Sequence, residues 1–199
     1  MTLLTEDSKR SLLRRARAAI ALAIGAPAPV APSASASAAA AATVDKPNAP
    51  DAPSFRAGAF VTLHLNGELR GCIGYPEDDL PLIDVVDRCA VSAAISDPRF
   101  PALALDEWSE VDIEISVLGP IERVSDISEV VVGRHGLIVE LGHRRGLLLP
   151  QVASERNWSA AEFASQTSAK AGLPRDAWRT GASLYKFEAE VFGDSETCW

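Results

Sequence analysis

The dipeptide Asn66-Gly67 constrains the fold of this chain more than any other feature of its sequence. It separates two apolar-rich runs, residues 60–65 and 68–75. Asn-Gly between such runs is the strongest short-range signal for a β-hairpin, because both residues tolerate the positive φ angles of a two-residue turn. We therefore expect an antiparallel strand pair at the centre of the fold.

The turn also predicts which residues of the two strands face each other. With a two-residue loop, Leu63 pairs with Arg70 and Val61 pairs with Cys72. Directly opposed residues point to the same side of a sheet, so we expect Arg70 and Cys72 on one face, beside two aliphatic side chains. A bulge at Gly67 would shift this register.

Alternating patterns predict further antiparallel strands. Apolar and polar residues alternate over 111–117 and 185–191. This pattern is typical of strands with one wet face, whereas the buried strands of a parallel sheet are continuously apolar. Glycines divide a later segment into three short strand-like runs, which predicts a second hairpin region, at 130–132, 137–141 and 146–149.

Three helices are predicted from their end signals and apolar spacing. Thr5 can cap the first helix and Gly25 ends it, while Pro81 stands in the first turn of the second. Ser159 opens the third helix, which Gly172 ends. The predicted fold class is therefore α+β, an antiparallel sheet of hairpins flanked by helices. The pattern is compatible with a fold that has, or lacks, a small second lobe.

Length and composition limit the organisation of the chain. Its 199 residues, 47% of them hydrophobic, suit one globular domain over 1–199. The Ala-, Pro- and Ser-rich stretch 26–52 is predicted to be a flexible insertion within that domain. No apolar run is long enough to span a membrane. Three cysteines without paired spacing suit a reducing compartment, so we expect a cytoplasmic protein. The sequence predicts no particular oligomeric state.

The motif Leu69–Gly74, Leu-Arg-Gly-Cys-Ile-Gly, resembles the signature of the AMMECR domain family. The likeness continues in the same order through nearly the whole chain outside residues 26–52. It includes Asp-Pro-Arg-Phe at 97–100, Gly-Arg-His-Gly-Leu at 133–137 and Leu-Pro-Gln-Val-Ala at 149–153. The resemblance implies an α+β fold with the Leu69–Gly74 motif near a cleft between two lobes.

The resemblance also implies partners. Bacterial relatives are often encoded with, or fused to, a Memo-like protein and a radical S-adenosylmethionine protein, so the chain is similar to component A of an AmmeMemoRadiSam system. The resemblance implies no particular reaction, substrate or cofactor. Many members carry a cysteine where this chain has Ser168. A mechanism that needs a thiol at that position would not operate here.

Two hypotheses of function follow, and they share one set of candidate residues: Leu69, Arg70, Gly71, Cys72, Ile73, Gly74, Asp97, Arg99, Arg134 and His135. In the first, the protein is a binding or regulatory module. Its three arginines in that set hold an anionic small molecule, a partner protein or nucleic acid, and Cys72 is only a close-packed small residue. The formal net charge of −8 disfavours nucleic acid.

In the second hypothesis the protein is a thiol-dependent enzyme. Cys72 is then the nucleophile or redox residue, Arg70 favours its thiolate form, and His135 acts as a base. The sequence places no base close to Cys72, and the expected neighbours of its thiol are apolar. Both observations favour the binding module. For Asp97 and Arg99 the alternative is a structural one, in which they tie their turn to neighbouring elements.

No metal or cofactor is predicted. His135, Glu140 and His143 lie close in sequence, but their spacing matches no known zinc pattern. A nucleotide-binding glycine fingerprint and a nucleophile elbow are both missing from the sequence. Cys89 falls on the apolar stripe of the second predicted helix, so we expect it to be a small buried hydrophobe.

Overall fold

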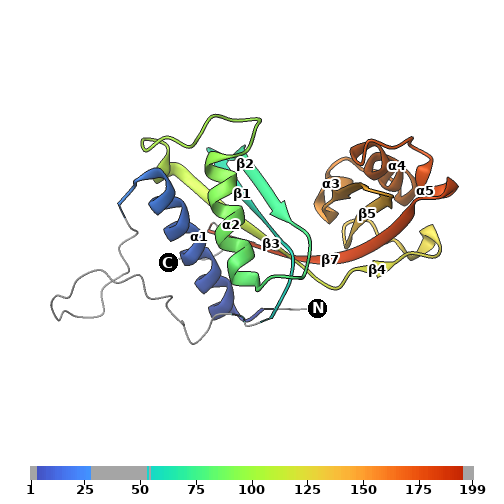
Figure 1. Ribbon diagram of the computed structural model, residues 1–199, viewed down its shortest axis with the longest axis horizontal. Coiled ribbons are helices and arrows are strands. Elements are labelled where there is room, and N and C mark those ends of the chain that lie inside the picture. The colour runs from blue at the N-terminus through green and yellow to red at the C-terminus, as the bar shows by residue number, and fades with distance from the viewer. Residues whose placement is uncertain (1–3, 28–52, 54, 195–199) are drawn as a thin grey trace. The chain divides into compact units, whose positions relative to one another are not determined.

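The computed structural model describes residues 4–27, 53 and 55–194, which belong to two compact units (Figure 1). Unit 1 contains Met1–Ser116 and Val191–Trp199, and unit 2 contains Val117–Glu190. Most of the predicted insertion, from residue 28 to residue 52, lies outside the described residues, as does Cys198.

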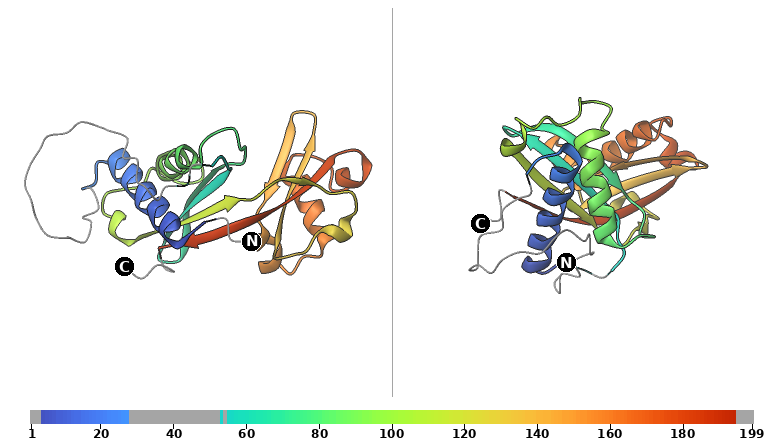
Figure 2. Two further views of the ribbon diagram at one scale, coloured as in Figure 1. Left: turned by 90° about the horizontal axis from the view of Figure 1, so that it is seen from below. Right: turned by 60° about the vertical axis from the view of Figure 1, so that its left-hand side comes forward.

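Unit 1 is built on an antiparallel strand pair covered by two helices. The strands β1 (Ala59–Leu65) and β2 (Glu68–Tyr75) form the predicted hairpin, and β2 is the edge strand in the order β2-β1-β3-β7. Helix α2 (Leu82–Ile95) packs on β1, β2 and α1 (Glu6–Ile24), and the two helices are drawn next to each other in the right-hand view of Figure 2. The strands β3 (Val111–Leu118) and β7 (Ser183–Gly193) each continue from one unit into the other.

The ends of the helices are those that the sequence predicts. The side chain of Thr5 accepts a hydrogen bond from the amide of Ser8, and Gly25 ends α1 with a φ of 73°. Helix α2 buries its apolar stripe, including Cys89, which is 3% exposed. Ser159 and Glu162 form the capping box that opens α4 (Ala160–Lys170).

The hairpin register is confirmed next to the turn and wrong beyond it. His64 pairs with Leu69 as expected, but Leu63 then pairs with Gly71 and Thr62 with Cys72. The reason is a β-bulge in which Arg70 is the extra residue, one that no residue of β1 opposes. Each later residue of β2 is therefore shifted by one position. The thiol of Cys72 consequently lies beside Thr62, and its expected pairing with Val61 is wrong, because Val61 pairs with Ile73.

A close approach between β2 and α2 explains the glycine next to Cys72. A Cβ atom at Gly71 would lie 2.2 Å from the carbonyl oxygen of Ala93, in the backbone of α2. Gly74 makes room in the same way for the ring of Phe60, because a Cβ atom at this position would lie 2.0 Å from the ring. Both glycines of the motif therefore have a packing role.

Unit 2 has its own strands and helices. The strands β5 (His135–Leu141) and β6 (Arg144–Leu148) form the second hairpin, β7 pairs with β5, and β4 (Glu122–Arg123) pairs with β7. The helices are α3 (Pro150–Glu155), α4 and α5 (Ala177–Thr180), and short 3₁₀ turns occur at Trp108–Glu110 in unit 1 and Ile127–Glu129 in unit 2. Its buried cluster centres on Phe163, Leu137 and Val139.

The predicted strand over residues 130–132 is wrong. Asp126 and Glu129 form a capping box that holds the 3₁₀ turn immediately before it, and the cap amide of Val130 donates to the carbonyl of Ile127. Val130 is 7% exposed and packs into the core, so its apolar character reflects burial in a turn rather than a strand. The α+β class, with an antiparallel sheet and flanking helices, is confirmed. Within the described residues no helix combines the length and the apolar character that crossing a bilayer requires.

We expect Gly71→Ala to lower the free energy of unfolding by about 2 kcal/mol, because the added methyl group meets a backbone carbonyl that cannot move away without shifting α2. Urea unfolding of the full chain measures this change. Glu68→Ala, at an exposed position of the same strand, is the control. An unchanged unfolding midpoint in Gly71→Ala would show that α2 and β2 are not held this close.

Candidate functional site

The backbone of Cys72 is covered at the open edge of β2 by the turn that follows α2. Its amide donates to Oδ2 of Asp97 at 2.9 Å, and its carbonyl oxygen accepts from Nη2 of Arg99 at 3.2 Å. Both backbone groups point away from β1, so Thr62 and Cys72 form a non-hydrogen-bonded pair with closely spaced side chains. The side chains of Asp97 and Arg99 thus take the place that a neighbouring strand would occupy.

Asp97 and Arg99 form a fixed ion pair. Nε of Arg99 donates to Oδ1 of Asp97 at 2.9 Å, and Nη2 donates to Oδ2 at 2.6 Å. The Asp97 side chain is 2% exposed, whereas that of Arg99 is 54% exposed. The carboxylate is therefore buried, and part of the guanidinium that it holds reaches solvent. The ring of Phe100 lies 5.5 Å from the guanidinium carbon of Arg99 and supports it further.

The electrostatics of this pair keep both groups charged. The hydrogen bond from Arg99 holds the pKa of Asp97 well below its usual range, and the amides of Cys72 and Arg99 act in the same direction against desolvation. In return, Asp97 raises the pKa of Arg99, and Cys72 contributes to that rise to a smaller extent. The site therefore presents a permanent positive charge next to Cys72.

The thiol of Cys72 is half-buried and has two polar neighbours. The hydroxyl of Thr62 donates to its sulfur at 3.4 Å, and the guanidinium of Arg99 is held at the carbonyl oxygen of the same residue. A guanidinium near sulfur favours thiolate chemistry, while a hydroxyl donor stabilises either a thiolate or an anionic ligand atom in its place. The arrangement can thus hold an anion or activate the thiol.

Arg70 is engaged by the loop that follows Phe100. Its guanidinium forms a bidentate ion pair with Glu107, in which Nε donates to Oε1 and Nη2 donates to Oε2, each at 2.8 Å. In addition, Nη1 donates to the carbonyl of Pro101 at 3.0 Å. The pair raises the pKa of Arg70 and lowers that of Glu107, chiefly through the side-chain hydrogen bonds. Arg70 is 8% exposed. It therefore anchors the loop over residues 101–107.

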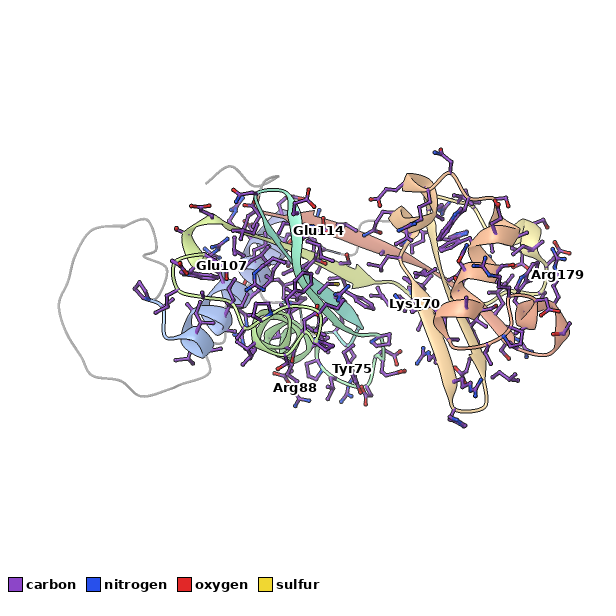
Figure 3. The ribbon with its side chains drawn as sticks, turned by 90° about the horizontal axis from the view of Figure 1, so that it is seen from above. Tyr75, Arg88, Glu107, Glu114, Lys170 and Arg179 are labelled. Atoms are coloured by element: carbon purple, nitrogen blue, oxygen red, sulfur yellow. The ribbon has the colours of Figure 1, made fainter. Side chains whose placement is uncertain are left out.

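Glu107 is the residue of this region that sequence reasoning missed (Figure 3). Its carboxylate also accepts from the amide of Ala104 at 2.9 Å, so it organises the loop from within. No local sequence pattern predicts this role of Glu107, because its partner Arg70 lies 37 residues earlier in the chain.

The remaining motif residues line the opposite side of the hairpin or its tip. Ile73 and Gly74 border a cavity of about 150 Å³ between β2 and α2, together with Tyr75, Arg88 and Cys89. Tyr75 and Arg88 are labelled on this side of unit 1 in Figure 3. Burial raises the pKa of Cys89 to about 11, so this thiol is inert, as expected. Leu69, near the turn, is 41% exposed.

Arg134 and His135 belong to unit 2, where each is engaged locally. Nε and Nη2 of Arg134 donate to Oε1 of Glu188 at 3.0 and 2.7 Å. Nδ1 of His135 accepts from the amide of Val131 at 3.0 Å, and burial lowers the pKa of the ring. A neutral His135 therefore already uses the lone pair with which it would take up a proton. Its role as a base stays a prediction.

The described residues form no cluster of side chains that could coordinate a metal ion. Among the described residues, no three His, Cys, Asp or Glu side chains gather in a group suited to metal binding. His135 is occupied by Val131, and the carboxylate of Asp97 is occupied by Arg99 and Cys72.

Comparisons with known proteins agree with the resemblance in sequence. A family model described as AMMECR1 matches residues 13–192. A protein of Methanothermobacter thermautotrophicus is 49% identical over 150 residues, which cover 72% of this chain and 78% of the relative. A protein of Methanococcoides burtonii is 45% identical over 157 residues, 76% of this chain and 78% of the relative. The crystal structure of an uncharacterized protein from Pyrococcus horikoshii matches with a TM-score of 0.80 at 36% identity, and the match covers 96% of this chain and 93% of that chain.

We expect Asp97→Asn to destabilise unit 1 by about 2 kcal/mol at pH 7, because a buried charged acceptor of several hydrogen bonds is lost. Since folding lowers the pKa of Asp97, its contribution is complete above the unfolded value of about 3.9 and declines as the pH falls below it. The difference in unfolding free energy between the wild type and Asp97→Asn should therefore shrink from pH 5 to pH 3, roughly across that unfolded value.

Urea unfolding at several pH values measures this difference. Asp106→Asn, at an exposed position of the neighbouring loop, is the matched control and should show no such trend. A difference between the wild type and Asp97→Asn that stays constant down to pH 3 would contradict the ionised, buried state of Asp97.

Proposed function

The chain belongs to the AMMECR1 family, and we propose that it is a binding module in which Arg99, held beside Cys72, recognises an anionic group of a partner protein. One observation carries the proposal. A guanidinium that is 54% exposed is locked in place by a carboxylate that is 2% exposed. The position of this charge is thus fixed before any ligand arrives, and a preorganised donor loses little entropy on binding.

The surroundings of Arg99 suit an anion. Nε and Nη2 of Arg99 contact Asp97, and Nη2 also reaches the carbonyl of Cys72, so Nη1 is the nitrogen whose N–H groups are left for a ligand among the described contacts. An oxygen of a carboxylate or phosphate can accept from Nη1. The hydroxyl of Thr62 and the thiol of Cys72 stand next to it. Leu69, exposed on the same strand, offers apolar contact area to a larger partner.

Binding fits the chemistry around the sulfur better than catalysis does. The hydroxyl of Thr62 contacts the sulfur of Cys72, and the guanidinium of Arg99 contacts the carbonyl oxygen of the same residue. Neither a hydroxyl nor a guanidinium takes up a proton at neutral pH. A general base is therefore missing from these contacts, and nucleophilic catalysis would need one or a preformed thiolate.

The partners that the family resemblance implies are a Memo-like protein and a radical S-adenosylmethionine protein encoded in the same genome. Both would be met in the cytoplasm, the reducing compartment that suits the free thiols of Cys72 and Cys89. Within such a system this chain would supply recognition and regulation, and the chemistry would belong to its partners.

We expect the full chain to bind one of these two partners, and Arg99→Ala to weaken that binding by at least about tenfold, because a charge-assisted contact is lost. Isothermal titration calorimetry with each purified partner measures the dissociation constant. Arg14→Ala removes the same charge from an exposed position of α1 and should leave the affinity unchanged. Binding of neither partner, or equal binding by Arg99→Ala and the wild type, would contradict the proposal.

The second candidate function is a thiol-dependent enzyme that uses Cys72. Its support is the contact between Arg99 and the carbonyl oxygen of Cys72, which holds a cation next to the residue that bears the thiol. Iodoacetamide labelling of the native, reduced protein at pH 7, read by peptide mass spectrometry, separates the two functions, with the buried thiol of Cys89 as an internal standard. The binding module predicts that Cys72 reacts no faster than free cysteine. Labelling of Cys72 that is much faster, and slowed in Arg99→Ala, would favour the enzyme.

A further inference from the structure

Unit 2 contains a cavity of about 470 Å³ that the proposed function does not use. Its polar wall is formed by side chains from β4, from the turn after it, from α5 and from the start of β7: Arg123, Ser125, Asp126, Trp178, Arg179 and Ser183. Its volume falls in the range of small-molecule sites. Arg179 lies at the periphery of unit 2, and its place is labelled in Figure 3.

Two arginines of this cavity have no carboxylate partner among the described residues. Within that part of the chain neither Arg123 nor Arg179 makes an ion pair, whereas Arg134 pairs with Glu188 and Arg145 with Glu140 in the same unit. The guanidinium groups of Arg123 and Arg179 thus line a concave surface without an ion-pair partner in the described part of the chain. They provide donors for an anionic oxygen group and repel cations.

Trp178 holds one of these arginines in position. The guanidinium carbon of Arg179 lies 4.5 Å from the centre of the Trp178 ring, close enough for a cation–π contact. The ring is itself fixed, because its Nε1 donates to the hydroxyl of Ser165 at 3.1 Å. Arg179 is therefore oriented by a side chain whose own position is set by α4.

Asp126 gives the same cavity a negative group. Its Oδ1 accepts from the amide of Ser128 at 2.8 Å, and hydrogen bonding by the side chain and then the amide of Ser128 lowers the pKa of Asp126, which is ionised at neutral pH. A carboxylate in the wall disfavours a ligand of high negative charge and favours one that also carries a hydrogen-bond donor. The apolar floor is formed by Val124 and Leu184, which are 9% and 6% exposed.

We infer that this cavity binds a small molecule in which an anionic oxygen group, phosphate or carboxylate, lies beside an ammonium or hydroxyl donor. The anionic group contacts Arg123 and Arg179, the donor contacts Asp126, and the carbon skeleton lies against Trp178 and the apolar floor. The site is independent of the Arg99 surface, because all of its residues belong to unit 2.

The indole N–H of Trp178 reports on binding at this site. We would titrate the ¹⁵N-labelled full chain with inorganic phosphate and, separately, with glutarate, at constant ionic strength. Trp178→Phe identifies the Trp178 resonance. We expect a saturable shift of this resonance with at least one probe, and an affinity lower by about tenfold or more in the Arg123→Gln, Arg179→Gln double variant.

Arg175→Gln, an exposed arginine that does not line the cavity, is the control and should bind as the wild type does. Saturation with phosphate alone identifies a phosphate site, and saturation with glutarate alone identifies a carboxylate site. The absence of a saturable shift with both probes would overturn the inference, as would a shift that persists in the double variant.

Phosphoethanolamine tests the part assigned to Asp126, because it adds an ammonium group to a phosphate. We expect it to bind more tightly than inorganic phosphate and to lose this advantage in Asp126→Asn, which keeps the Oδ1 acceptor of the turn. Equal binding of the two compounds by the wild type would overturn the role of Asp126. Loss of the Ser128 amide shift in Asp126→Asn would reveal an unfolded turn, and Asp126→Ser, which keeps a capping oxygen without the charge, then replaces it.

Discussion

The carboxylate of Asp97 is the interaction on which the candidate site depends. It accepts from the amide of Cys72 at the edge of β2 and from two nitrogens of Arg99, while almost none of it reaches solvent. Each of these contacts satisfies a group that would otherwise lack a partner: an edge amide, a buried charge and a long flexible cation. One side chain thereby closes a sheet edge and fixes a positive charge.

This arrangement assigns different tasks to the two arginines of unit 1. Arg70 uses its hydrogen bonds on Glu107 and on the carbonyl of Pro101, so its charge stabilises a loop. Arg99 keeps half of its surface free beside the thiol of Cys72. Arg70, within the motif Leu69–Gly74, is thus buried in contacts with a loop, whereas Arg99, next to the motif, is exposed to solvent. We propose that Arg99 is the arginine that contacts a partner. In unit 2, Arg123 and Arg179 line a cavity and have no carboxylate partner in the described part of the chain.

Local signals predicted the elements, and tertiary contacts decided the site. The Asn66-Gly67 turn, the Thr5 cap and the Ser159 capping box involve neighbours in sequence, so the helices and hairpins could be predicted. The bulge at Arg70 could not, because no local sequence signal marks it and Glu107, the partner of Arg70, lies 37 residues away in the chain. For Asp97 and Arg99 the structural alternative matches their contacts, yet only the structure distinguishes the buried carboxylate from the exposed guanidinium.

The exchange rate of the Cys72 amide proton, measured by NMR at pH 7 in the wild type and in Asp97→Ala, tests most directly whether Asp97 organises this site. We expect the amide to be protected in the wild type, although it lies at a sheet edge, and to lose at least about tenfold protection in the variant while amides between β1 and β2 keep theirs. Rapid exchange of Cys72 in the wild type, or unchanged protection in Asp97→Ala, would contradict this organisation and with it the fixed position of Arg99.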